Sequence, residues 1–201
     1  MENKISFENF IKQNNLFDDN KNVETILKSK EVIRLKCDFE IEGTVPKNII
    51  LDDQNYDMEI SISDNDKIKL IPEIIVVGIG CRKNKDYSEL LDFYYETLKS
   101  LKISPKSVKK ITSIDIKKDE QGLIKLAQKE NVPFVTYSAE ELLKAEGDFT
   151  SSGFVKSITG VDNVCERSAK IGSKNGKILL HKTAFNGMTI SVSQEEYKLK
   201  F

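Results

Sequence analysis

The sequence has little of what marks several large protein classes. Its 201 residues include three cysteines, one histidine and no tryptophan. Cys37, Cys81 and Cys165 are odd in number and far apart, which argues against a disulfide framework. A single histidine and the absence of a CxxC pair leave few ligands for zinc. We therefore expect no metal site built by the protein itself.

Two further absences concern partners and location. The chain carries 31 Lys+Arg against 32 Asp+Glu, so no surplus of positive charge favours nucleic acid or a membrane surface. No apolar run approaches the ~20 residues of a membrane-spanning helix. The first residues, MENKISFENF, lack the basic and then apolar layout of a signal peptide. We expect a soluble, cytoplasmic protein that binds neither nucleic acid nor membrane.

The pattern of residues 1–72 is that of a small α/β domain. Apolar residues at helical spacing predict short helices around residues 7–11 and 23–27. The segment between them, NNLFDDNKN, is rich in Asn and Asp and predicts a turn. Alternating apolar and polar positions predict strands within 30–39 and 58–62.

From residue 73 onward the pattern changes. The run IIVVGIG at 74–80 is continuously apolar and predicts a strand buried on both faces. Helices are predicted at 86–102, 119–130, 139–144, 153–159 and 163–173, and further strands at 109–116, 133–137, 177–180 and 188–192. Strands that alternate with helices predict an α/β domain over 73–201, a three-layer sandwich around a mainly parallel or mixed sheet.

The first candidate site is the turn GIGCRK, which leaves the end of the buried strand. Ligands of open α/β sheets bind outside the carboxyl ends of strands, and Gly78 and Gly80 would let a ligand approach the backbone. Arg82 and Lys83 would offer cations to carboxylates or phosphates. Lys83 stands where the third glycine of GxGxxG would be, which excludes a dinucleotide fingerprint. The alternative is that the glycines only shape a strand-to-helix turn.

A second candidate runs from Ser113 to Gly122, from the end of a strand into a helix. A helix N-terminus favours anions, Lys117 adds a charge, and Glu120 is a candidate general acid or base. Acidic residues in a first helical turn are also ordinary complements of the helix dipole. Both interpretations of Glu120 stay open.

A third candidate is the loop and helix start from Gly160 to Ala169. Asn163 would cap the helix and place Cys165 and Glu166 in its first turn, where a thiol pKa can be lowered. No base is evident near Cys165, so a core thiol is the default. The single histidine, His181, is a candidate proton shuttle or an ordinary polar residue.

The order of these segments is more specific than any one of them. The blocks VVGIGCRK, TSIDIKKDEQGL, PFVTYSAEEL, FVKSITGVDNVCERSA and LLHKTAFNGMTISV together resemble the C-terminal domain of the CbiG family of cobalt-precorrin-5A hydrolases. That family includes the stand-alone CobE proteins. Residues 1–72 resemble its central linker domain, and the family's N-terminal domain has no counterpart. The chain thus looks like a truncated or split form, which we expect to fold but to be incomplete for catalysis.

The resemblance implies a reaction in anaerobic vitamin B12 biosynthesis. The family opens the δ-lactone of cobalt-precorrin-5A, releases acetaldehyde and forms cobalt-precorrin-5B. Cobalt arrives inside the substrate, so no cofactor is implied. Glu120 and Glu166 match the family's acidic positions and are the implied acid or base. The implied substrate contacts are Gly78, Gly80, Cys81, Arg82, Lys83, Ser113, Lys117, Cys165 and Lys182.

Other interpretations stay open. The chain could be a non-catalytic module that binds or carries a tetrapyrrole intermediate. It could instead be a nucleotide-binding α/β domain with a phosphate on the turn at 78–82. The sequence does not distinguish a monomer from a homodimer.

Overall fold

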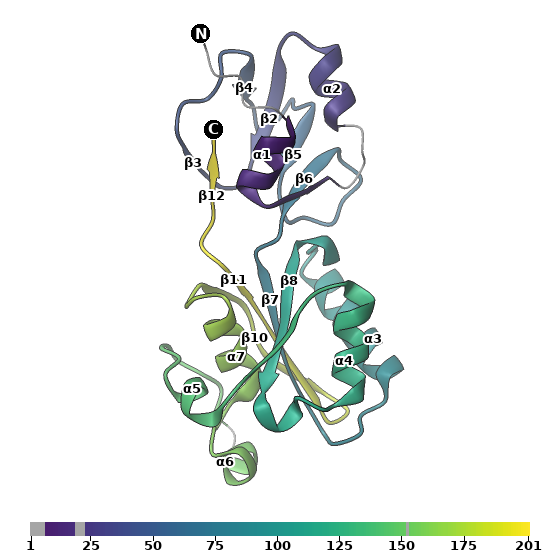
Figure 1. Cartoon of the computed structure of the whole chain (residues 1–201), viewed down its shortest axis with the longest axis vertical. Coiled ribbons are helices and arrows are strands. Elements are labelled where there is room, and N and C mark those ends of the chain that lie inside the picture. The colour runs from purple at the N-terminus through teal and green to yellow at the C-terminus, as the bar shows by residue number, and fades with distance from the viewer. Residues whose placement is uncertain (1–6, 19–22, 152) are drawn as a thin grey trace. The chain divides into compact units, whose positions relative to one another are not determined.

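The computed structural model describes residues 7–18, 23–151 and 153–201 (Figure 1). The chain divides into two compact units, the first comprising the described residues up to Glu73 with 102–107 and 197–201, and the second comprising 74–101 and 108–196. The residue pattern places 102–107 and 197–201 in the second domain. The structure assigns both segments to the first unit because Ile103 bridges to Ser63 and Leu199 pairs with Ile41.

The first unit is a five-stranded sheet with two helices. The sheet order is β1 (Leu16–Asp18), β6 (Lys69–Pro72), β5 (Met58–Ile60), β2 (Ile33–Cys37) and β4 (Ile49–Leu51). All neighbouring pairs are parallel except β1 with β6. Two shorter strands, β3 (Glu40–Glu42) and β12 (Lys198–Lys200), pair in parallel. The helices are α1 (Phe7–Asn14) and α2 (Val23–Ser29), as the apolar spacing predicts.

One prediction for this unit is wrong. The segment NNLFDDNKN is predicted as a turn, but Leu16–Asp18 forms strand β1 because it pairs with β6, with Phe17 opposite Ile71. That pairing joins residues far apart in the sequence, so local turn composition does not reveal it. The rest of that segment, 19–22, lies outside the described residues.

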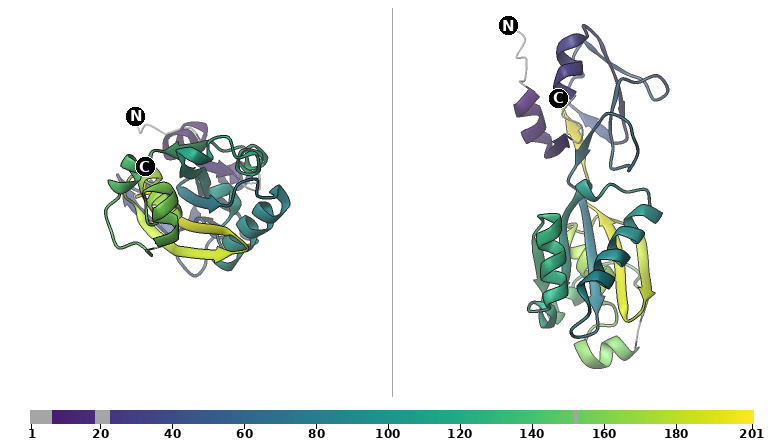
Figure 2. Two further views of the ribbon diagram at one scale, coloured as in Figure 1. Left: turned by 90° about the horizontal axis from the view of Figure 1, so that it is seen from below. Right: turned by 90° about the vertical axis from the view of Figure 1, so that its right-hand side faces the viewer.

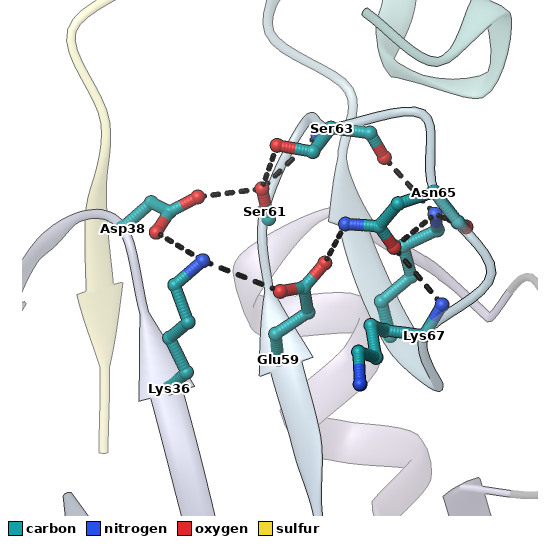
Figure 3. A network of polar contacts seen from close by, with 8 residues as sticks. Lys36, Asp38, Glu59, Ser61, Ser63, Asn65 and Lys67 are labelled. Carbon is teal, nitrogen blue, oxygen red and sulfur yellow. Dashed lines mark hydrogen bonds and ion pairs between the residues drawn. The ribbon is translucent and has the colours of Figure 1, made fainter. Parts of the chain in front are cut away.

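Charged side chains form a buried network in this unit (Figure 3). Lys36, Glu59 and Lys69 are cross-strand neighbours on β2, β5 and β6, and Glu59 and Lys69 are at most 1% exposed. Glu59 accepts hydrogen bonds from Asn65 Nδ2 at 2.8 Å and Lys36 Nζ at 3.3 Å. Lys69 Nζ donates to the Ser63 carbonyl at 3.0 Å and to Asn65 Oδ1 at 3.1 Å. Buried charges that are satisfied in this way fix the intervening loop.

The second unit contains a mixed five-stranded sheet, as predicted. Its order is β10 (Lys177–Phe185), β11 (Met188–Gln194), β7 (Ile75–Cys81), β8 (Val108–Ile114) and β9 (Phe134–Tyr137). Strands β7, β8 and β9 are parallel, and β11 is antiparallel to both of its neighbours. Strand β10 extends past the predicted 177–180 because the hairpin continues to Phe185 and Met188.

Helices cover both faces of this sheet, which confirms the three-layer prediction (Figures 1 and 2). Helices α3 (Tyr87–Ser100) and α4 (Gln121–Glu130) pack together on one face. Helix α7 (Val164–Gly172) packs on the other, near α5 (Ala139–Leu143), and α6 (Gly153–Thr159) precedes it. A 3₁₀ turn, η1 (Pro105–Ser107), belongs to the first unit, and a second, η2 (Asp115–Lys117), precedes α4.

Side-chain caps fix the helix starts where the sequence predicts them. Asp86 accepts from the backbone N–H groups of Ser88 and Glu89, and Ser138 forms a capping box with Glu141. Asn163 accepts from the Glu166 N–H at 2.9 Å and begins α7. No helix within the described ranges is both long enough and apolar enough to cross a membrane.

Candidate functional site

Some of the predicted site residues lie at the carboxyl edge of the second unit's sheet. Strands β7, β8 and β9 run parallel, so Cys81, Ile114 and Tyr137 end at one edge. The β10–β11 turn joins them there, because Met188 lies opposite Cys81. This edge is at the bottom of Figure 1, and the left view of Figure 2 faces it. Ligands of open α/β sheets bind at such edges.

The turn after β7 presents two free cations. Arg82 and Lys83 are exposed, and no carboxylate in the described part of the chain pairs with either. The Arg82 N–H donates to the Gly187 carbonyl at 3.0 Å, which fixes this turn against the β10–β11 turn. Asn84 adopts a φ of 56°. That left-handed conformation is one that glycine and asparagine tolerate best.

Glu120 is the centre of one polar cluster, at the start of α4. It is 8% exposed, and Oε1 accepts from the Lys85 N–H at 3.1 Å. Oε2 accepts from Lys117 Nζ at 3.2 Å, so Lys117 already has an acidic partner. Burial raises the pKa of the nearby Cys81 thiol to about 11, although the Lys117 charge acts in the opposite direction. Cys81 is therefore a thiol rather than a thiolate near neutral pH.

A hollow of about 280 Å³ adjoins this cluster. It lies between the first residues of α3 and α4, and its lining consists of Asn84, Lys85, Asp86, Tyr87, Glu120, Gln121, Gly122 and Lys125. The N-terminal end of α4 faces it without a side-chain cap. The sequence signal for this hollow was the strand-to-helix segment that ends at Gly122.

Glu166 is the centre of a second cluster, at the start of α7. Its carboxylate is fully buried, and Oε1 accepts from the Lys182 N–H at 2.6 Å. Oε2 accepts from the Thr150 N–H at 3.1 Å and lies 3.5 Å from His181 Nδ1. Burial alone would raise the pKa of Glu166, but the hydrogen bonds from Lys182, Thr150 and His181 outweigh it, so the pKa is lowered. Glu166 is therefore an ionised anchor that joins α7 to β10 and to the loop before α6.

Other predicted contacts lie in the packed interior. A Cβ added at Gly78 would meet the Cys165 carbonyl oxygen at 1.9 Å, so Gly78 lets α7 lie against β7. A Cβ at Gly80 would meet Thr189 Oγ1 at 2.7 Å. Ser113 is buried and donates to the Ile79 carbonyl at 2.6 Å. Cys165 is 1% exposed and burial raises its pKa to about 12, as expected of a core thiol.

The structure does not bring the two predicted acid–base residues together. Glu120 begins α4 and Glu166 lies in α7, and these helices cover opposite faces of the sheet. Glu166 instead contacts His181, a pairing that no spacing in the sequence indicates. Lys182 donates its backbone N–H to the same carboxylate, while its ammonium group has no acidic partner among the described residues.

Sequence reasoning also missed a set of exposed apolar side chains. Four large apolar residues of the second unit, all on elements at the carboxyl edge, are more than half exposed: Ile116, Leu143, Ile158 and Phe185. The one available signal was Ile116, an apolar residue in a polar loop. Exposed apolar residues that gather at one place mark binding surfaces.

These features define an α/β domain whose sheet edge carries unpaired cations and exposed apolar side chains. The chain belongs to the family described as cobalamin synthesis G C-terminus, whose model matches residues 75–193. This confirms the resemblance seen in the sequence.

Individual relatives agree with the family. The chain is 38% identical over 124 residues to the cobalt-precorrin-5A hydrolase of Salmonella typhimurium, covering 62% of this chain and 35% of that protein. It is 34% identical over 126 residues to the enzyme of the same name from Priestia megaterium, covering 63% and 33%. The chain thus spans about a third of the length of these curated relatives.

Solved structures support the same assignment. The crystal structure of CobE, a protein from the cobalamin biosynthetic pathway, matches with a TM-score of 0.58 and 26% identity, over 64% of this chain and 94% of CobE. A cobalamin biosynthesis protein G homologue from Sulfolobus solfataricus matches with a TM-score of 0.52 and 25% identity, over 98% of this chain and 62% of that one. The second match includes both units.

Proposed function

We propose that the chain acts in cobalamin biosynthesis as a portion of a cobalt-precorrin-5A hydrolase. It binds cobalt-precorrin-5A at the carboxyl edge of the second unit and takes part in opening the δ-lactone. The names of the relatives support the reaction, and the family match covers the unit that carries this edge. The cobalt belongs to the substrate.

The observation that carries the proposal is the combination of free cations and exposed apolar side chains at one edge. Arg82, Lys83 and Lys182 have no acidic partner in the described residues. Phe185, at the end of β10, and Ile116, in η2, are 63% and 60% exposed. A corrinoid precursor is an apolar macrocycle fringed with carboxylates. Cations bind its rim and apolar side chains pack on its face.

Lactone opening needs an activated water and donors for the oxyanion that develops. Glu120 is 8% exposed and lines the hollow at the start of α4, where we keep it as a candidate acid or base. Glu166 is fully buried, which suits a positioning residue better than one that touches the substrate.

An anaerobic titration of the chain with cobalt-precorrin-5A tests the proposal. The visible spectrum of the substrate reports binding, and acetaldehyde reports turnover. We expect saturable spectral change that weakens in the double variant Arg82→Ala/Lys182→Ala. Lys177→Ala, exposed at the far end of β10, is the matched control. If the titration gives no spectral change and no acetaldehyde, the proposed function is overturned.

A second candidate function is binding or carriage without catalysis. Both oxygens of Glu120 and of Glu166 already have internal partners, which is compatible with a purely structural role for each. A spectral change without acetaldehyde, in the presence of the rest of the biosynthetic machinery as well as in its absence, would favour this candidate.

A further inference from the structure

The strand that carries His181 is bulged at that residue. Leu180 lies opposite Val192 and Thr183 opposite Ile190, so His181 and Lys182 on β10 oppose the single residue Ser191 on β11. A bulge of this kind releases backbone groups from the ladder and re-aims side chains, and bulges are common beside active sites. Here the Ser191 hydroxyl donates to the Leu180 carbonyl at 2.8 Å and replaces part of the lost pairing.

The groups released by the bulge meet the Glu166 carboxylate. The Lys182 N–H donates to Oε1 at 2.6 Å, and His181 Nδ1 lies 3.5 Å from Oε2. Oε2 is held from the other side by the Thr150 N–H at 3.1 Å, and the Asn163 amide donates to the Thr150 carbonyl at 2.9 Å. The carboxylate is therefore fixed in position by two separate backbone segments.

His181 differs from Glu166 in exposure. The Glu166 side chain is 0% exposed, whereas the His181 side chain is 66% exposed, on β10 at the level of the middle of β7. An anionic acceptor beside Nδ1 keeps the proton of a neutral imidazole on Nδ1. Because the two ring nitrogens point in different directions, the Nε2 lone pair is then directed away from the carboxylate and is available to a ligand.

We propose that His181, oriented by Glu166, is the general base for lactone opening. This inference rests on the proposed function and assigns the activation of water to His181 in place of Glu120. His181 Nε2 takes a proton from a water molecule while the water oxygen bonds to the lactone carbonyl carbon and the carbonyl electron pair moves onto its oxygen. The resulting oxyanion collapses, the ring C–O bond breaks, and the alkoxide that leaves takes the proton from the imidazolium. Glu166 is a positioning residue in this step.

The alternative is that Glu166 only holds α7 against β10 through hydrogen bonds and that His181 has no role in catalysis. That role requires the two backbone hydrogen bonds but not the imidazole. It predicts no particular tautomer of His181 and no loss of turnover when His181 is replaced.

The first test needs no substrate. The chain has one histidine, so long-range ¹H–¹⁵N correlations of its neutral imidazole are unambiguous. We expect the proton on Nδ1, in contrast to the Nε2–H tautomer that free histidine prefers in water. A predominant Nε2–H tautomer would overturn the inference whatever the chain binds.

The second test uses cells of the organism that makes the protein, grown anaerobically without vitamin B12. In vivo, His181→Asn should lower the conversion of cobalt-precorrin-5A by about 100-fold, the lower limit expected for loss of a general base. Lys177→Ala should behave as wild type, and purified His181→Asn should keep its spectral response to substrate. A wild-type rate in His181→Asn would overturn the inference alone. Normal cobalamin formation after deletion of the whole chain would overturn the proposed function as well.

Discussion

Replacing Gly78 with alanine tests whether this residue serves packing or ligand binding. Gly78 lies in the middle of β7, directly under α7. The added Cβ would lie 1.9 Å from the Cys165 carbonyl oxygen and 2.9 Å from Ser168 Oγ. The nearer atom belongs to the backbone of α7, so no change of rotamer relieves the clash. The helix itself would have to move.

The size of the effect follows from this geometry. Restoring an ordinary contact distance of 3.4 Å requires a shift of about 1.5 Å. Such a shift opens gaps around Cys165 and Ala169, which are fully packed against the sheet. Overpacking of a core costs about 1–3 kcal/mol, and a clash with backbone belongs at the upper end. We therefore expect Gly78→Ala to lower the free energy of unfolding by about 3 kcal/mol.

Urea unfolding followed by far-UV circular dichroism measures this change. At an m-value of ~2 kcal/mol/M, the midpoint for the second unit should fall by roughly 1.5 M. Gly153→Ala is the matched control, because nothing lies within 4 Å of its added Cβ. It should leave the midpoint nearly unchanged. A loss below about 1 kcal/mol in Gly78→Ala, with weaker substrate binding, would refute the packing argument and restore the ligand role.

Three further predictions concern the carboxyl edge. Folding lowers the pKa of Glu166, so its ionised form adds stability above the ordinary value of 4.5 and this contribution is lost as the pH falls below it. Glu166→Gln should be less stable by about 1–3 kcal/mol at pH 7, with a smaller loss at pH 3, as measured by urea midpoints; equal losses would contradict this. Because the pKa of Cys81 is about 11 in the folded chain, iodoacetamide at pH 8 should alkylate it about 100-fold more slowly than in urea. Peptide mass spectrometry measures the two rates, and equal rates would contradict the burial of Cys81. Arg82→Ala should weaken binding of cobalt-precorrin-5A about tenfold at low salt and less at high salt, whereas a salt-independent loss would argue against a charge contact.

Local patterns predicted much of the second unit. The apolar run that forms β7 and the side-chain caps at Asp86 and Ser138 are all properties of short segments. Parallel strands with intervening helices then follow from the alternation of elements. The order and spacing of five separated blocks, rather than any single motif, indicated the family.

What the sequence could not predict depends on pairing between distant segments. Strand β1 and the return of β12 to β3 require partners far along the chain. The approach of His181 to Glu166 depends on the bulge in β10, where His181 and Lys182 oppose one residue of β11. No residue type in this segment signals a bulge. Glu120 and Glu166 each lie near the start of a helix, and local sequence does not indicate that these helices cover opposite faces of the sheet.

The return of β12 to the first unit has a consequence for the order of folding during synthesis. A ribosome makes residues 7–73 before the second unit, and the strand Lys198–Lys200 that pairs with β3 comes after both. The ring centroids of Phe201 and Phe10 lie 5.4 Å apart in a stacked pair. Part of the first unit's core therefore forms only after this last segment has been made. The nascent first unit therefore exposes an unpaired strand and an incomplete core until the last residues of the second unit and β12 have been made. Elongation rate, rather than sequence alone, would then set how long that surface is open to chaperones.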